Sequence, residues 1–158
     1  MVIAEALVTL LKEKKLKISF AESCTGGLMA STIVDVSGAS SVFEYGFVTY
    51  SAEAKINMLG VSEETIKKFG VVSCETAKEM VVGVSQRASS DVAISVTGCA
   101  GPGKDTDGNE EGTICFGFCL NGNVISEKMH IEGKSRNKIR KNAVEYAFNR
   151  IIHFINRS

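Results

Sequence analysis

Residues 17–36 read KISFAESCTGGLMASTIVDV, and this stretch changes its pattern twice. Its first six residues, KISFAE, are typical of a strand, whereas GLMASTIVDV at 27–36 has the composition of a helix with small residues along one side. The intervening SCTGG breaks the strand, and its two glycines permit a tight turn. A strand that turns directly into a helix indicates an α/β protein.

The rest of the chain continues this alternation. In chain order we expect a helix at 2–14, a strand at 46–51, helices at 52–60 and 62–70, a short strand at 71–73, a helix at 75–88, a strand at 91–98, a hairpin of 112–120 with 124–132, and a long amphipathic helix from 135 onward. Helices and strands alternate early in the chain and a hairpin follows. This order predicts the α/β class, as a three-layer α/β/α sandwich with a mixed β-sheet. We expect one domain, spanning residues 1–158.

Composition narrows the possible partners. The 18 basic and 18 acidic residues balance, so no direct nucleic-acid partner is expected. No secretory signal opens the chain, and its apolar runs are too short to span a bilayer, which excludes a membrane partner. The five cysteines are an odd number without paired spacing, which fits a reducing cytosol and predicts a cytoplasmic protein. Whether the chain forms a homo-oligomer stays open.

Metal binding is not expected. Cys115 and Cys119 are four residues apart, but they lie in the β-like run GTICFGFCL, and no second pair of Cys or His completes a zinc site. Small buried hydrophobic side chains are the simpler interpretation of these cysteines.

Ser23 stands at the turn between the strand and the helix of the opening stretch. A hydroxyl there can act as a nucleophile, because the free N–H groups of the first helical turn, from Cys24 through Thr25 and Gly26 to Gly27, could hold a developing oxyanion. The alternative is a helix cap without chemistry, with Ser23 or Thr25 as the N-cap.

A serine nucleophile needs a base, and neither the sequence around Ser23 nor the two histidines of the chain supplies a familiar one. The surrounding sequence does not match G-x-S-x-G, and His130 and His153 are better interpreted as surface or hydrogen-bonded residues than as the base of a triad. A lysine is the known alternative. Lys55 follows the strand end that carries Tyr50, and partial desolvation there would favour its neutral form. An exposed helical lysine is the competing interpretation.

Two further segments could bind an anion. The run VTGCAGPGKDTDG at 96–108 carries Gly98, Gly101 and Gly103, which fit a backbone nest for a phosphate or carboxylate, although a turn without a ligand fits equally well. The last helix opens with cations that include Arg136 and Arg140. Because cations at a helix start oppose the dipole, an anionic substrate is one explanation, and a solvated basic face is the other.

Taken together, these segments resemble the CinA C-terminal domain family, also known as nicotinamide-nucleotide amidase. The matching stretches are AESCTGG (21–27), GFVTYSAEAKINMLGV (46–61), GVVS (70–73), SVTGCAGPG (95–103) and EGTI (111–114). Their order and spacing agree with the family over nearly the whole chain. The resemblance is to a stand-alone form, without the N-terminal nucleotide pyrophosphatase domain that many relatives carry.

The resemblance implies an α/β/α enzyme that hydrolyses the amide of nicotinamide mononucleotide, a small-molecule nucleotide, without metal or cofactor. It makes Ser23 the nucleophile and Lys55 the base, with Tyr50 and Thr97 as supporting residues of the active site. It also implies a basic residue of the last helix at the substrate phosphate, for which Arg140 is our first choice and Arg136 our second.

Three points stay open beside the resemblance. The family often has an aliphatic residue where this chain has Cys99, and Lys-Pro where it has Glu110 and Glu111, so substrate preference is less certain than reaction type. Cys24 is an alternative nucleophile, because a thiol at a helix N-terminus can be activated. A non-catalytic nucleotide-binding or competence-associated partner protein is the alternative from another functional class.

Overall fold

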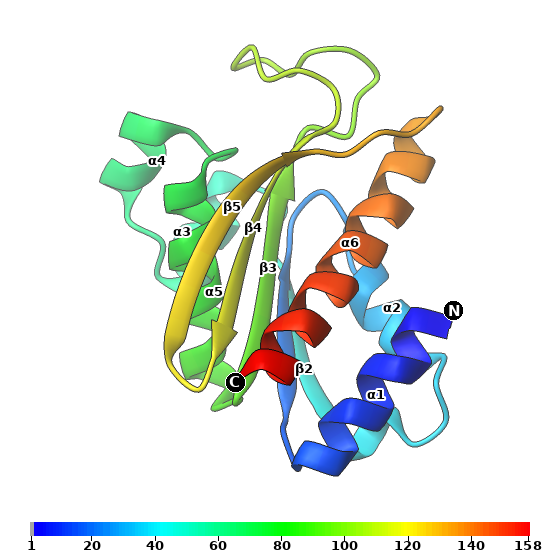
Figure 1. The fold of residues 1–158 in the computed structure, drawn as a ribbon. Helices are drawn as coiled ribbons and strands as arrows, with labels where there is room; N and C mark the ends of the chain where they lie inside the picture. Colours follow the sequence, from blue (N-terminus) through cyan, green and yellow to red (C-terminus); the bar gives the residue numbers. More distant parts are fainter. Residues whose placement is uncertain (1) are drawn as a thin grey trace.

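The computed structural model describes residues 2–158, and its helices and strands follow the expected order (Figure 1). In chain order they are α1 (Val2–Lys14), β1 (Ile18–Glu22), α2 (Leu28–Val34), the 3₁₀ turn η1 (Ala39–Ser41), β2 (Phe43–Val48), α3 (Ala52–Leu59), α4 (Glu63–Phe69), α5 (Cys74–Ala88), β3 (Val92–Gly98), β4 (Thr113–Leu120), β5 (Asn123–His130) and α6 (Arg136–Arg157).

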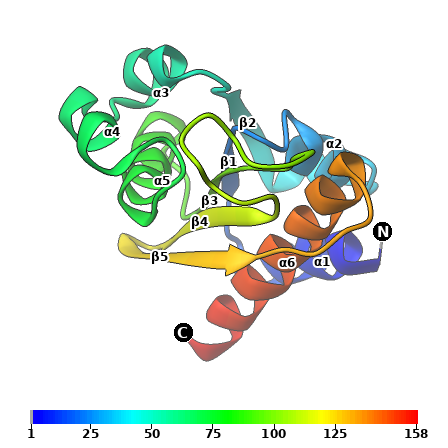
Figure 2. The ribbon, with the colours of Figure 1, turned by 90° about the horizontal axis from the view of Figure 1, so that it is seen from above.

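The five strands form one mixed sheet in the order β2-β1-β3-β4-β5. Strand β1 is parallel to β2 and β3, whereas β4 and β5 are antiparallel to their neighbours. Helices α1, α2 and α6 cover one face, and α3, α4 and α5 lie on the other (Figures 1 and 2). The expected α/β class, with three layers and a mixed sheet, is confirmed.

Two expectations were wrong in detail. Residues 71–73 are irregular rather than a short strand, because the Val71 carbonyl accepts a hydrogen bond from the Thr97 hydroxyl and Ser73 caps α5. The second strand begins and ends three residues earlier than the expected 46–51, so that Thr49 and Tyr50 leave the sheet. Short apolar runs carry no periodicity that would settle either point.

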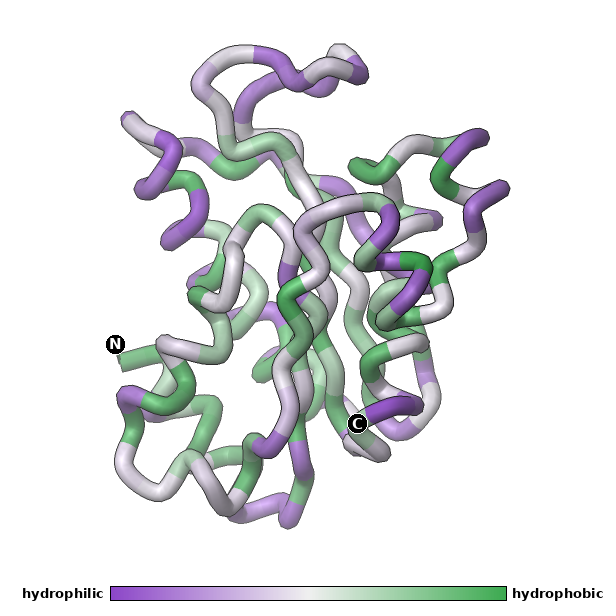
Figure 3. Tube along the Cα trace, turned by 180° about the vertical axis from the view of Figure 1, so that it is seen from behind, coloured by the Kyte–Doolittle hydropathy of each residue, from purple (hydrophilic) through white to green (hydrophobic). Residues whose placement is uncertain are grey.

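Strand β1 is buried on both faces, and its successive side chains point alternately into two hydrophobic clusters, one on each side of the sheet. Phe20 belongs to the cluster beneath α1, α2 and α6, where its ring lies 5.9 Å from that of Phe148. Ala21 belongs to the cluster beneath α3 and α5, with Leu59 and Val84. The strands at the centre are hydrophobic, whereas the tip of the loop between β3 and β4 is hydrophilic (Figure 3).

The three parallel strands bring their carboxyl ends to one edge of the sheet. Glu22 ends β1, Val48 ends β2 and Gly98 ends β3, and the residues that follow each strand meet there. In open α/β sheets this edge is the usual place for a ligand site. Among residues 2–158, no helix is long and apolar enough to cross a membrane.

Close packing of α3 on α5 generates a prediction about stability. Gly83 is buried in the middle of α5, and a Cβ added there would collide with the Leu59 carbonyl oxygen. Helix propensity alone favours alanine over glycine by about 1 kcal/mol, but overpacking costs about 1–3 kcal/mol. Because the atom in the way is a backbone oxygen, the upper end of that cost applies. We therefore expect Gly83→Ala to lower the free energy of unfolding by about 2 kcal/mol in urea denaturation.

The exposed Gln86 on the same helix supplies the control, since Gln86→Ala should change stability by less than about 0.5 kcal/mol. A Gly83→Ala protein as stable as this control would contradict the packing of α5 against α3.

Candidate active site

Glu22 organises the turn after β1. Its side chain is only 1% exposed, and its carboxylate accepts hydrogen bonds from the backbone N–H groups of Gly27 (3.1 Å), Met29 (3.0 Å) and Ala30 (2.9 Å). A carboxylate at a helix N-terminus satisfies donors that have no partner inside the helix and complements the dipole. Glu22 thus fixes the start of α2 relative to the end of β1, with Ser23 between them.

This arrangement changes which donors remain at the turn. The N–H of Gly27 is occupied by Glu22, and that of Gly26 donates to the Ser23 carbonyl at 3.0 Å. Within residues 2–158, the N–H groups of Cys24 and Thr25 have no hydrogen-bond acceptor. Of the four expected oxyanion donors, these two are the ones that stay available.

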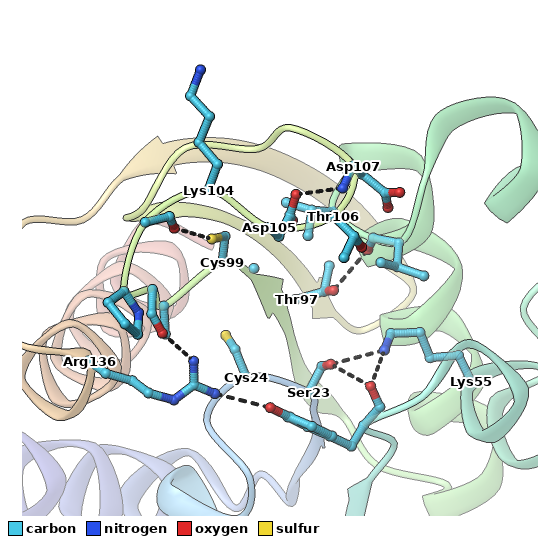
Figure 4. A pocket seen from close by; sticks show the side chains of 18 residues that line it. Ser23, Cys24, Lys55, Thr97, Cys99, Lys104, Asp105, Thr106, Asp107 and Arg136 are labelled. Atoms are coloured by element: carbon cyan, nitrogen blue, oxygen red, sulfur yellow. Dashed lines mark hydrogen bonds between the residues drawn. The ribbon is translucent and has the colours of Figure 1, made fainter.

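The Lys55 side chain, from α3, points toward Ser23 (Figure 4). Helix α3 begins after Ser51, whose hydroxyl accepts from the Ala54 N–H, and this start places Lys55 one turn into the helix. The Lys55 side chain is 1% exposed, and its Nζ lies 2.9 Å from Ser23 Oγ. It also donates to the carbonyls of Thr49 (2.9 Å) and Tyr50 (3.3 Å).

The surroundings of Lys55 favour its neutral form. Burial lowers the pKa of the Lys55 ammonium from 10.5 to about 8, because the charged form loses its hydration. Its hydrogen-bond partners in the described chain are a hydroxyl and two carbonyls, with no carboxylate to restore the charge. Lys55 can therefore take a proton from Ser23 near neutral pH.

Cys24 lies beside Ser23 but is chemically different. Its thiol is buried, and this burial raises the pKa of Cys24 to about 12, with the charges of Lys55 and Arg140 only partly opposing the effect. A thiol is a nucleophile only as a thiolate. Burial of the Cys24 thiol therefore favours the Ser23 hydroxyl as the nucleophile of this site.

Tyr50 and Thr97 occupy supporting positions. The backbone carbonyl of Tyr50 faces Lys55, whereas its ring is 63% exposed and its hydroxyl accepts from Arg136 at 3.0 Å. Thr97 is buried on β3 and donates to the Val71 carbonyl at 2.8 Å, which holds the segment before α5 against the sheet. Neither side chain hydrogen-bonds to Ser23 or Lys55 in the described chain.

A cavity of about 410 Å³ opens above Ser23 and Lys55. This volume lies within the ~300–1,000 Å³ range usual for small-molecule sites. Its far wall is the loop between β3 and β4, including Gly98, Gly101 and Gly103, with Arg136 at one side. Thr25, Gly26 and Gly27 do not line the cavity, and shape the turn beneath it instead. Gly101 and Gly103 have φ angles of 80° and 73°, a conformation that favours glycine.

The two arginines of α6 have different surroundings. Arg136 lines the cavity, where its guanidinium donates to the Gly101 carbonyl and the Tyr50 hydroxyl. Arg140 lies one turn later, outside the cavity lining, and donates to the carbonyls of Cys24 (2.9 Å) and Thr25 (2.8 Å). Arg136 therefore lies on the cavity wall, whereas Arg140 lies under the turn.

Sequence reasoning missed Glu22 and the Val71 carbonyl. The signal for Glu22 was a carboxylate at the end of an apolar strand just before a helix, where a charge needs buried partners. The Val71 carbonyl carried no signal, because a backbone group has no sequence identity.

The fold and the site together define a class: a three-layer α/β/α protein whose cavity, at the carboxyl ends of parallel strands, holds a buried serine–lysine pair. The model of the CinA C-terminal domain matches residues 1–155, and the chain belongs to this family.

Individual relatives agree with this assignment. A CinA-like protein of Kosmotoga olearia is 48% identical over 143 residues, covering 90% of this chain and 34% of that protein. A putative competence-damage inducible protein of Clostridium acetobutylicum is 43% identical over 153 residues, covering 97% and 36%. The chain thus spans about a third of the length of the curated relatives it matches.

Solved structures agree as well. The competence/damage inducible protein CihA of Agrobacterium tumefaciens has a TM-score of 0.91 at 38% identity, covering 98% of this chain and 93% of that one. A CinA superfamily protein of Klebsiella pneumoniae has a TM-score of 0.95 at 29% identity, covering 99% and 97%.

The environment of Lys55 generates a prediction that requires no substrate. Direct NMR titration of the Lys55 side chain should give a pKa near 8, far below that of the exposed lysines. Because burial is the main cause, the Ser23→Ala protein should keep this low value. Exposed Lys67 in the same spectra provides the reference. A Lys55 pKa near 10.5 would contradict a desolvated site.

Proposed function

We propose that this chain is an amidohydrolase that converts nicotinamide mononucleotide to nicotinic acid mononucleotide and ammonia. The observation that carries the proposal is the buried contact of Lys55 Nζ with Ser23 Oγ at 2.9 Å, without a carboxylate beside the lysine. The resemblance to nicotinamide-nucleotide amidases supplies the substrate, and the names of the relatives do not state an activity.

The first half of the cycle forms an acyl-enzyme. Neutral Lys55 takes the proton of the Ser23 hydroxyl, and Oγ attacks the carboxamide carbon. The carbonyl oxygen becomes an oxyanion, for which the N–H groups of Cys24 and Thr25 are the available donors. The Lys55 ammonium then gives its proton to the departing nitrogen, and ammonia leaves.

The second half returns the enzyme to its starting state. Lys55, neutral again, takes a proton from a water molecule that attacks the ester carbon. The ester bond to Ser23 Oγ breaks, the proton passes from Lys55 to that oxygen, and nicotinic acid mononucleotide is released. Nucleophile, base and oxyanion donors are all groups of the chain, so this scheme uses no cofactor.

Arg136 is the residue that we assign to the substrate phosphate. Its guanidinium lies on the cavity wall, and guanidinium groups bind phosphate through paired hydrogen bonds. The backbone of the loop around Gly101 and Gly103 lies on the same wall and offers further donors. Arg140 instead holds the turn that carries Ser23.

Alanine variants of Ser23 and Cys24 distinguish between the two neighbouring candidate nucleophiles. Ser23→Ala should abolish ammonia release from nicotinamide mononucleotide, whereas Cys24→Ala should keep much of it, because burial raises the pKa of the Cys24 thiol and disfavours the thiolate. A coupled ammonia assay on both purified variants measures this, with circular dichroism to show that each is folded. Loss of activity in Cys24→Ala alone would exchange the two roles.

Lys55 should act as a base and not only as a charge. Since burial lowers the pKa of its ammonium to about 8, kcat/KM should rise as the pH approaches 8 and level off above it, because the neutral amine is the active form. Lys55→Arg should be as inactive as Lys55→Ala, because guanidinium does not lose its proton. Substantial activity in Lys55→Arg would show that charge alone is sufficient.

The two arginines should differ in substrate dependence. Arg136→Ala should raise KM for the mononucleotide by roughly 10- to 100-fold, the equivalent of about 1.5–3 kcal/mol for a charged hydrogen bond, and leave the riboside without phosphate little changed. Arg140→Ala is the matched control, since loss of its contacts with the turn should affect both substrates alike. Equal losses on both substrates in Arg136→Ala would remove the phosphate assignment.

A further inference from the structure

Two cysteines lie on packed elements, α5 and β4, behind the cavity wall. Cys74 is the first residue of α5 and is half-buried, whereas Cys115 is fully buried on β4. Both are free thiols, as are the other three cysteines of the chain. The proposed reaction uses neither of them.

Packing of α5 directly on β4 brings these residues together. A Cβ added at Gly117 of β4 would lie 2.5 Å from the Ala77 carbonyl oxygen of α5, and Ser95 of β3 donates to the same carbonyl. Cys74 precedes Ala77 by three residues on one helix face, and Cys115 precedes Gly117 by two on one strand face. Three residues along the helix correspond to a rise of about 4.5 Å, and two residues along the strand correspond to about 6.6 Å.

Both steps lead in the same direction, because α5 and β4 each begin at the cavity end of the sheet (Figure 1). The nearness of the two thiols also affects the acidity of Cys115. The pKa of its thiol is raised to about 12, chiefly by burial and secondly by the neighbouring Cys74 thiol. Cys115 also shares a small apolar cluster with Val72 and Ala77.

We propose that Cys74 and Cys115 are a site of reversible oxidation, at which a low-molecular-weight disulfide such as glutathione disulfide links them into an intramolecular disulfide. The Cys74 sulfur attacks one sulfur of glutathione disulfide, loses its proton and releases the first glutathione. The Cys115 sulfur then attacks the Cys74 sulfur, loses its proton and releases the second. Two thiols are oxidised and one disulfide is reduced to two glutathione molecules, so the reaction balances.

The roles of the two thiols follow from their exposure. Cys74 is the one that an external disulfide can reach, since Cys115 and the other three cysteines are buried. Cys115 is protonated and enclosed, so the second step is the slower one. A mixed disulfide of Cys74 with glutathione is therefore the expected intermediate. In a reducing compartment such a pair responds to oxidation and is not a permanent link.

The position of this pair connects it to the cavity. Val71 and Val72, which line the cavity, precede Cys74 by three and two residues. Thr97, whose hydroxyl binds the Val71 carbonyl, pairs with Cys115 across β3 and β4. A bond between Cys74 and Cys115 draws the start of α5 toward β4 and so moves the wall that Val71 and Val72 form.

The test is incubation of the purified chain in buffers of glutathione and glutathione disulfide, followed by mass spectrometry. We expect the loss of two hydrogen atoms and, after trypsin, a cross-link between the peptide 69–78, which holds Cys74, and the peptide 105–128, which holds Cys115. Dithiothreitol should reverse it. No cross-link under oxidising buffers, or a cross-link of another pair such as Cys24 with Cys99, would overturn the proposal.

Matched serine variants identify the partner, because the peptide 105–128 also holds Cys119. Cys119→Ser should keep the cross-link, whereas Cys74→Ser and Cys115→Ser should lose it. NMR amide signals of Val71 and Thr97 should shift on oxidation of the wild type but not of Cys74→Ser. Unchanged signals in a fully cross-linked wild-type protein would refute the connection to the cavity. None of these measurements depends on the proposed amidase activity.

Discussion

A lysine nitrogen buried without a carboxylate is the constraint on which the rest of this structure depends. Lys55 is 1% exposed, and burial lowers the pKa of its ammonium to about 8, which corresponds to about 1.4 kcal/mol for each pH unit of the shift. The fold supports this unfavourable charge with the carbonyls of Thr49 and Tyr50 and the hydroxyl of Ser23. All three groups follow carboxyl ends of the parallel strands β1 and β2, so the sheet itself sets the geometry of the pair.

The turn that carries Ser23 is held by two side chains of opposite charge. Glu22 binds N–H groups at the start of α2, and Arg140, from the far end of the sequence, binds the carbonyls of Cys24 and Thr25. With the donors of α2 and the acceptors of the turn both occupied, the N–H groups of Cys24 and Thr25 are left without partners among residues 2–158. The contacts of Glu22 and Arg140 thus hold the turn in place, although α2 itself has only seven residues.

The segment between α4 and α5, residues 70–73, joins the cavity wall to the helical layer that contains α5. It forms no strand, but the Val71 carbonyl accepts a hydrogen bond from Thr97 of β3 and the Ser73 hydroxyl caps α5, so the segment is tied to both elements. Because α5 rests on β4 at Gly117 and on α3 at Gly83, a shift at its first residue has little room to be absorbed. Residues with no contact to a substrate can therefore change the shape of the cavity wall.

Local sequence was sufficient for most elements, since helical spacing, glycine stops and apolar runs depend on neighbours in the chain. It also singled out Ser23, Lys55 and the glycines of the 98–112 loop, because their motifs are continuous. It could not separate Arg136 from Arg140, which are one helical turn apart and differ only in what the fold places opposite them. The partners of Glu22, the irregular 71–73 segment and the packing of α5, which begins at Cys74, on β4, which carries Cys115, were likewise decided by tertiary structure alone. Each joins groups that only the packed sheet brings together.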